Sequence, residues 1–509
     1  MFEFIKSYPF LAALIVPVIS FFFQSYPRFF NRYFGIDLWM RMMETDLVRE
    51  NNHRIPTKKI RKNFIFEGYF STPPVFPWLF SYVPKKTLEK YQGFISPLFD
   101  IIQNLVVFGI TYHLTQNLET SLIAQVIYAT MPIAILENSY LTPRSLGYLN
   151  FTLAFYPILY YSNFHDIRFL FVGFGFTILL FLTHRFALQS LLFVGLFFSV
   201  IEKTLIYPLI FFASMFIAIL LSRGYYLRVL KGHLSITHFW IINYRYRFAH
   251  QIRGIVANKK SDFLGLIYYL LSTFTPISLV ATNLWLIIPL GYMLNQWLLL
   301  FPLPLIDPFI FKMSLWVLFC YILAVLVLSV KYLIPIGEGQ RYLEMALAPT
   351  AVVTTTLFQV LISNDHKYLA YLLFFSILTF NITLTVYSQL KGVIQDKTRS
   401  VRDTTKQVFN FLNNIRPIPR IMCIPHYNAA MYAYNTKTKV LMDIEVCKIN
   451  ETSFLSPILR RKVSDIASEY NLDYLVLNKR YATKDELKLS KNKVVFATDD
   501  IEVINIRQR

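Results

Sequence analysis

Three charged residues stand at helical spacing in the segment GIDLWMRMMETDLVRENNHRIP, from Gly35 to Pro56. Asp37, Arg41 and Glu44 are four and three residues apart, so they would share one face of a helix. A carboxylate held at a membrane surface can accept the proton of a hydroxyl group, and a guanidinium can hold a phosphate. The spacing by itself shows only an acid at a suitable depth, and it is also typical of an interfacial helix in which Asp37 and Arg41 form an ordinary ion pair.

The same helix would carry an apolar face. We expect that face to lie in the plane of the membrane interface and the charged face to point away from it. The apolar residues are Ile36, Met40, Met43 and Leu47.

The composition places this helix beside a membrane. The chain has 509 residues, of which 55% are hydrophobic and 16% are charged, and its mean hydropathy is +0.44. A soluble protein would have about 25% charged residues. Long apolar runs such as Phe309 to Val330 approach the roughly 20 residues that cross a bilayer. The sequence predicts a polytopic α-helical membrane protein with about 11–13 transmembrane helices and a small C-terminal α/β domain.

Twelve segments are candidates for crossing the membrane. They lie near residues 8–23, 94–113, 121–137, 145–161, 167–183, 186–200, 204–222, 263–280, 283–301, 309–334, 343–362 and 367–389. We count 186–222 as one net crossing, because 186–200 is short. The first segment is read as a retained span, since it lacks a small-residue cleavage pattern.

The net charge of +20 is consistent with attraction to anionic lipid headgroups, or with binding of an anionic substrate. Nucleic acid is excluded as a partner, because no basic soluble domain stands apart from the spans. Residues 223–261 contain eight Lys and Arg and no acid, so the positive-inside rule places them in the cytoplasm. Eleven crossings then put Asp37 and the C-terminal domain together on the extracytoplasmic side.

The expected domains follow from these spans. Residues 1–390 form the transmembrane domain, whose first external loop, 24–92, includes the amphipathic helix near 35–54. Residues 391–419 form a helical linker, and 420–509 form a small soluble α/β domain.

Within the C-terminal domain we predict a helix over Ser456 to Tyr470. The predicted strands are Arg420 to Ile424, Ala429 to Tyr434, Val440 to Cys447, Tyr474 to Asn478, Lys493 to Thr498 and Ile501 to Ile506.

The first loop resembles that of the GT-C superfamily of membrane glycosyltransferases. Gly35, Asp37 and Trp39 form the pattern Gly-x-Asp-x-Trp, Arg41 and Glu44 follow it, and the sequence FEGYFSTPPVFPWLFSYVP precedes the second span. Members of this superfamily take sugars from polyprenyl-phosphate or polyprenyl-diphosphate carriers. They include aminoarabinose transferases, protein O-mannosyltransferases and oligosaccharyltransferases.

Three later segments extend the resemblance. MPIAILENSYLTPRSLGYL is similar to the turn with a second acidic motif, where Glu137 matches and Ser139 replaces a second acid. THRFALQ places His184 and Arg185 at the end of a span. IGEGQRYLEMALAPTA resembles a late loop in which an arginine binds the donor phosphate.

The resemblance implies a role for each residue. The catalytic residues would be Asp37, the base of an inverting transfer, and Glu137. The residues that bind the donor phosphate would be Arg341, Arg144, Arg185 and Arg41, and the supporting residues would be Glu44, His184 and Glu344. Structural alternatives stay open, since Arg341 and Arg144 could be helix-end residues, Glu137 a hydrogen-bonded helix terminus and His184 an interfacial residue.

The predicted function is transfer of a sugar from a polyprenyl-phosphate donor to a hydroxyl of a glycan, lipid or protein, in a multi-pass protein of a prokaryotic cell membrane. No cofactor is predicted, and no metal, because HExxH, paired CxxC and DxD motifs are missing from the external loops. Two alternatives stay open: a glycan ligase that uses a diphosphate donor, which a metal-binding acid pair would favour, and a lipid-linked glycan flippase or transporter. Transporters commonly show inverted repeats, broken helices and acids at mid-membrane. Here no repeat is visible and the acids cluster at predicted membrane surfaces, which favours the enzyme.

Overall fold

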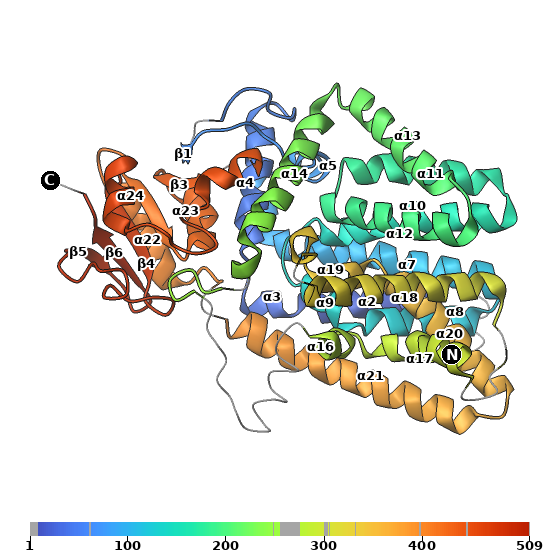
Figure 1. Cartoon of the computed structure of the whole chain (residues 1–509). Coiled ribbons are helices and arrows are strands. Elements are labelled where there is room, and N and C mark those ends of the chain that lie inside the picture. Colours follow the sequence, from blue (N-terminus) through green and yellow to red (C-terminus); the bar gives the residue numbers. More distant parts are fainter. Residues whose placement is uncertain are drawn as a thin grey trace. The chain divides into compact units, whose positions relative to one another are not determined.

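The chain folds into two compact units (Figure 1). The computed structural model describes residues 9–60, 63–247, 249–254, 275–299, 304, 306–330, 332–396, 399–443 and 446–507. The helical unit comprises Met1–Phe30, Gly93–Arg223 and Lys260–Ile394. The mixed unit comprises Asn31–Gln92, Gly224–Lys259 and Gln395–Arg509.

Nearly all of the described part of the helical unit is α-helix, as the apolar runs predict. Its helices are α2 (Pro9–Ser25), α3 (Pro27–Phe30), α7 (Ile95–Thr115), α8 (Leu118–Ala129), α9 (Pro132–Glu137), α10 (Arg144–Phe164), α11 (Ile167–Phe181), α12 (Arg185–Glu202), α13 (Ile206–Leu221), α16 (Pro276–Ala281), α17 (Ile287–Leu298), α18 (Pro308–Ser329), α19 (Gly339–Glu344), α20 (Leu347–Ser363) and α21 (Lys367–Gln389). Short 3-10 turns cover Leu284–Leu286 and Ile334–Ile336, and a π-helical turn covers Leu390–Ile394.

Side-chain caps fix several of these helix starts. Asp307 accepts hydrogen bonds from the backbone N–H groups of Phe309 and Ile310, at 2.8 and 3.3 Å, before α18. Asn117 caps α8 in the same way. Such caps satisfy N–H groups that the helix itself leaves without partners, so polar residues mark the boundaries between apolar runs.

Five helices in the described residues are long and apolar enough to cross a membrane by length and composition. They cover Leu11–Phe30, Lys85–Thr115, Arg185–Glu202, Pro308–Ser329 and Lys367–Ile394. Shorter apolar helices, α8, α11, α13 and α20, accompany them. The predicted segments coincide with helices, except that most of 263–280 lies outside the described residues.

Residues 186–222 form two helices, and the prediction that they make one net crossing stays a prediction. Here α12 has 18 residues, long enough by itself to cross a membrane, and α13 follows as a separate helix of 16 residues.

The mixed unit contains a six-stranded sheet flanked by helices. Its strands are β1 (Phe64–Phe66), β2 (Arg420–Ile424), β3 (Lys439–Asp443), β4 (Tyr474–Asn478), β5 (Val494–Ala497) and β6 (Ile501–Asn505). Its helices are α4 (Asp37–Glu50), α5 (Val75–Ser81), α6 (Lys85–Tyr91), α14 (Tyr225–Asn243), α22 (Asp403–Asn414), α23 (Ala429–Asn435) and α24 (Val463–Glu469), with 3-10 turns at Tyr244–Tyr246, His426–Asn428 and Val446–Thr452.

The strand order is β1-β3-β2-β4-β6-β5. The first four strands of this order run parallel, and β6 and β5 run antiparallel. The register of β2 on β4 pairs Ile421 with Tyr474 and Ile424 with Leu477. The edge strand β1 comes from the first loop, so this loop and the C-terminal segment build one sheet.

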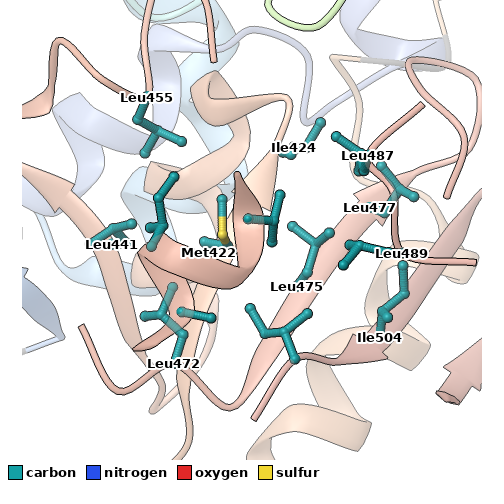
Figure 2. Close-up of a cluster of buried hydrophobic side chains, with 14 of the residues drawn as sticks. Met422, Ile424, Leu441, Leu455, Leu472, Leu475, Leu477, Leu487, Leu489 and Ile504 are labelled. Atoms are coloured by element: carbon teal, nitrogen blue, oxygen red, sulfur yellow. The ribbon is translucent and has the colours of Figure 1, made fainter. Parts of the chain in front are cut away.

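One face of the sheet holds the apolar core of the mixed unit (Figure 2). Alternate residues of the strands point to this face, as the period of two requires. Met422 and Ile424 of β2, Leu475 and Leu477 of β4 and Ile504 of β6 all belong to the core. Val463, Ile466 and Ala467 of α24 cover it.

The strand predictions are confirmed at β2, β4, β5 and β6, and one is wrong. Residues 429–434 were expected to form a strand, but they form helix α23, with Ala429 to Ala433 buried. The segment AAMYAYN contains three alanines, the strongest helix former, and this outweighs its aromatic residues. The predicted helix at 456–470 is shortened to α24.

The two compact units differ from the domains predicted with limits at residues 390 and 420, because the mixed unit also includes Asn31–Gln92 and Gly224–Lys259.

The predicted topology is wrong at one point. Residues 223–261 were expected on the opposite side from the C-terminal domain, yet α14 packs against the turn Val446–Thr452. Arg253 also forms an ion pair with Glu486, with Nε 2.6 Å from Oε1. Segments that pack together share one side of a membrane, so the basic loop and the C-terminal domain cannot lie on opposite sides.

Candidate functional site

Helix α4 presents Asp37 as its first residue. The side chain is partly exposed, and no hydrogen bond or ion pair joins its carboxylate to any residue that the structure describes. An acid in the first turn interacts favourably with the positive end of the helix dipole. Asp37 is therefore an accessible carboxylate that keeps its oxygens available.

The ion pair of α4 lies one turn further along. Arg41 Nη1 is 2.6 Å from Oε2 of Glu44, and the Glu44 side chain is buried. Glu44, expected on the exposed charged face, is therefore inside the protein. It holds a guanidinium in place.

The apolar face predicted for α4 is only partly the buried one. Ile36, Met40 and Leu47 remain partly exposed, whereas the residues buried alongside Met43 are Leu38, Trp39, Met42 and Val48. The Trp39 ring packs on Tyr33 and Tyr434, with centroids 6.0 and 5.5 Å apart. Helices α5 and α23 pack against α4 within the mixed unit, so protein rather than lipid determines which face is buried.

A second cluster lies in the helical unit, at the start of α10. Arg144 is 7% exposed, and its Nη1 donates a hydrogen bond to Oε2 of Glu137, the last residue of α9. The same nitrogen is 3.6 Å from Oε1 of Glu344, the last residue of α19. Glu137 and Arg144 thus form one cluster with Glu344, which is distant in the sequence, and we call it the α10-start cluster.

Glu344 is the most deeply buried acid of this cluster, at 2% exposure. Neither carboxylate oxygen has a hydrogen-bond partner among the described residues. Burial raises the pKa of the Glu344 carboxyl, and the positive charges of Arg144 and Arg341 partly oppose this rise. A buried acceptor without hydrogen bonds is costly, and a native site that retains one has a reason to do so.

Arg341 lies beside this cluster on α19. Its Nε is 2.8 Å from Oε2 of Glu338, and its guanidinium lies 5.8 Å from the centre of the Phe186 ring. Glu338 therefore orients Arg341, while Glu344, expected to be a supporting residue, lies nearest Arg144. The Arg341 side chain is 29% exposed.

His184 has a structural position. It is the N-cap of α12, and its Nδ1 accepts a hydrogen bond from the backbone N–H of Ala187, at 3.1 Å. A Cβ on Gly147 of α10 would come within 2.6 Å of the His184 ring, so a glycine is needed for this close packing. Arg185 follows His184 directly and is the first residue of α12.

The sequence reasoning missed Asp100, on α7. This residue is 1% exposed, and its carboxylate accepts hydrogen bonds from the hydroxyls of Tyr128 and Tyr148, both at 2.6 Å, and from Gln24 Nε2 at 2.5 Å. Asn138 donates to Gln24 and to Tyr148. The network ties α2, α7, α8 and α10 together, next to Glu137. A lone acid in an apolar segment was the signal that could have identified it.

A contrasting cluster includes a residue near the opposite end of α10. Glu202 ends α12, and its Oε1 is 2.7 Å from Nζ of Lys312, in the first turn of α18. Its Oε2 accepts from the hydroxyls of Ser162 on α10 and Tyr207 on α13. We call this the α12-end cluster.

Site residues predicted from the sequence therefore fall into two groups. Glu137, Arg144 and Glu344 meet in the α10-start cluster, with Arg341 close enough to act on Glu344. Asp37, Arg41 and Glu44 lie together on α4, in the mixed unit. In the described part of the chain no three His, Cys, Asp or Glu side chains are grouped closely enough to hold a metal ion.

The fold resembles that of solved membrane proteins. ArnT from Cupriavidus metallidurans bound to undecaprenyl phosphate aligns over 97% of this chain and 97% of its own, with a TM-score of 0.52 and 8% identity. Its apo state aligns over 98% of both chains, with a TM-score of 0.42 and 10% identity. The arabinofuranosyltransferase AftD from Mycobacteria aligns over 98% of this chain and 40% of its own, with a TM-score of 0.49 and 11% identity. No protein-family model and no curated protein matches the chain.

Proposed function

The chain has the GT-C fold, and from this premise we propose that it is an integral-membrane glycosyltransferase that takes a sugar from a polyprenyl-phosphate donor. The observation that carries the proposal is the α10-start cluster. There, Arg144 and Arg341 surround a buried carboxylate, in a fold that is similar to a protein solved with undecaprenyl phosphate. Guanidinium groups are the preferred partners of phosphate, because they stay charged and donate paired hydrogen bonds.

In this proposal Arg341 and Arg144 hold the donor phosphate. Glu137 and Glu338 fix the two guanidinium groups in orientation, since each accepts a hydrogen bond from one of them. Arg185 and Arg41 are the further candidates for contacts to phosphate.

The reaction is a single displacement. The acceptor oxygen forms a bond to the anomeric carbon, the bond from that carbon to the phosphate oxygen breaks, and the polyprenyl phosphate leaves with the electron pair. The acceptor proton passes to a carboxylate, and we assign this base to Asp37 because no described residue pairs with its oxygens. General base catalysis contributes about 10²–10⁴-fold. Glu137 stays a second candidate for assisting the acceptor.

The test is transfer in vitro, with the purified chain and a radiolabelled polyprenyl-phosphate sugar. Asp37→Asn keeps the size of the side chain and removes the base, so we expect the rate to fall by about 10²-fold or more. The control is Glu50→Gln, which makes the same change at the exposed end of α4. Equal rates for the native chain and Asp37→Asn would show that Asp37 is not the base.

The same assay separates the alternatives. If only diphosphate-linked oligosaccharides are consumed, the chain is a glycan ligase. If no donor is consumed while a glycan crosses sealed vesicles, it is a flippase or transporter.

We further propose that the mixed unit lies on the extracytoplasmic side of a prokaryotic cell membrane. Single cysteines at Arg245 and Tyr474 would report the side of each segment. Both should be labelled by an impermeant reagent from outside, since the two segments belong to one compact unit. Labelling only after permeabilisation would place this unit in the cytoplasm.

A further inference from the structure

Helix α14 has a line of exposed apolar side chains along one face, which we call the α14 stripe. Leu227, Leu234 and Ile241 follow one another at intervals of seven residues, close to two helical turns, so they lie in one line. They are 53%, 59% and 54% exposed, and Ile242 beside them is 55% exposed. Single exposed apolar residues are ordinary on a protein surface, whereas a continuous line of them marks a surface that contacts an apolar partner.

The opposite face of α14 is packed inside the mixed unit. Val229 and Phe239 are buried, and the helix packs against the turn Val446–Thr452 of the same unit. The hydroxyl of Tyr225 also donates a hydrogen bond to the backbone oxygen of Thr72, at 2.6 Å. The helix therefore cannot turn its apolar stripe inward without losing these contacts.

Basic side chains accompany the stripe. Arg223, Lys231 and Arg245 are exposed, and their spacing from Leu227 places them on the same face of the helix. None of the three forms an ion pair with a residue that the structure describes. From Lys203 to Ser261 the sequence contains no Asp or Glu. The face is therefore both apolar and positively charged.

The segment before α14 indicates what covers this face. Helix α13 is apolar, and Leu209, Phe216 and Leu221 along it are exposed, as is expected of a surface that contacts lipid tails. Three residues separate α13 from α14, so α14 begins within about 14 Å of the end of α13. The start of α14 is thus held near the boundary of the hydrocarbon region.

We propose that α14 lies in the membrane interface and binds anionic phospholipids along the α14 stripe. The leucine and isoleucine side chains would enter the acyl-chain region, and Arg223, Lys231 and Arg245 would bind the lipid phosphates, since a helix with both kinds of residue on one face binds anionic membranes. A second copy of α14 is a poorer partner, because it presents the same basic residues and no acid. The proposal does not depend on the transfer reaction.

The experiment measures quenching of a fluorophore by lipid, with the full-length chain in nanodiscs. The three native cysteines are replaced by alanine, and bimane is attached at Leu234→Cys. Brominated acyl chains quench only a fluorophore that reaches the hydrocarbon region, so fluorescence should fall about twofold or more relative to unbrominated lipid. The matched control is bimane at Gln407→Cys, on the polar exposed face of α22, where no quenching is expected.

The same label at Leu234 tests the preference for anionic lipid. Brominated phosphatidylglycerol, as a minor component, should quench about twofold more than brominated phosphatidylcholine at the same fraction, because basic residues concentrate the anionic lipid around the helix. The double change Lys231→Gln with Arg245→Gln should remove this preference. The double change Lys491→Gln with Lys493→Gln, which removes the same charge beside β5, should keep it.

Gel filtration and melting of each variant establish that it is folded. The proposal is overturned if bimane at Leu234 is not quenched, if the two brominated lipids quench it equally, or if the changes at Lys231 and Arg245 leave the preference intact. Disulfide cross-linking of Leu234→Cys between two chains, without quenching by lipid, would assign the stripe to a contact between copies instead.

Discussion

The two charged clusters near the start and the end of α10 differ in how their buried acids are paired. In the α12-end cluster the Glu202 carboxylate has two hydroxyl donors and one ammonium group, so its charge is balanced by the protein. In the α10-start cluster Glu344 has an arginine 3.6 Å away and no hydrogen bond from any described residue. Removing one partner of a balanced buried pair is costly, whereas a buried carboxylate that has no hydrogen-bond donor is already held at a cost.

The largest effect should come from breaking the balanced cluster. Lys312→Ala leaves Glu202 buried without its cation, which we expect to lower the free energy of unfolding by about 3–5 kcal/mol. The transfer rate per folded molecule should stay within twofold of native, because this cluster is at the far end of the helices.

Denaturant unfolding followed by tryptophan fluorescence measures this loss. The control is Arg168→Ala, which removes the cation of an exposed ion pair with Asp166. Exposed pairs are screened by water, so this variant should unfold like the native chain. Equal unfolding of the two variants would contradict the proposed difference between buried and exposed pairs.

Next in size is the loss of a phosphate ligand. Arg341→Ala should lower the transfer rate by about 10²–10³-fold, since removing one donor to a developing charge costs that much. Unfolding should change little, because this side chain is partly exposed. Steady-state kinetics with the lipid-linked donor measures the change, and the exposed Lys203→Ala serves as the control. A native rate in Arg341→Ala would remove this residue from the site.

A smaller effect is expected at Asp100. Its buried carboxylate has hydrogen-bond donors, like that of Glu202, but all of these donors are neutral. Asp100→Asn keeps the shape and turns one acceptor into a donor facing a tyrosine hydroxyl, at a cost of about 1–3 kcal/mol. Thermal melting measures this cost. Transfer should fall as well if the network positions the turn between α9 and α10. Melting at the native temperature would show that the network does not hold these helices.

The smallest effect is a dependence of stability on pH. Burial keeps the pKa of the Glu344 carboxyl above its ordinary 4.5. Between 4.5 and the raised value the folded chain binds more protons than the unfolded chain, so stability should fall as pH rises through that window. Glu344→Gln cannot ionise, so melting curves should show a weaker pH dependence in this variant. An unchanged pH dependence would mean that Glu344 does not titrate in that range.

Much of the fold follows from sequence because it depends on local patterns. Apolar runs and their polar caps locate helices such as α8 and α18, and short continuous apolar runs locate the buried strands β2 and β4. The edge strand β1 could not be found in this way, because three residues of a loop become a strand only by pairing with β3. The topology prediction failed for a related reason, since the packing of α14 on a distant turn has no local signal.

The candidate site shows the same division. The family resemblance suggested Glu137, Arg144, Arg341 and Glu344, but only the structure brings the first two and the last together. It also shows that Glu338, which was not predicted, holds Arg341. Which acid orients which arginine depends on the path of the loop before α19, and side-chain spacing does not encode that path.

The mixed unit has a consequence for biogenesis. Phe64 of β1 pairs with Val440 of β3 in the sheet. During translation β1 is therefore synthesised hundreds of residues before the strand with which it pairs. During synthesis that unpaired edge is open to wrong partners, which is a hazard for aggregation. A chain cut short before β3 would leave the edge exposed permanently, and quality-control proteases would be expected to remove it.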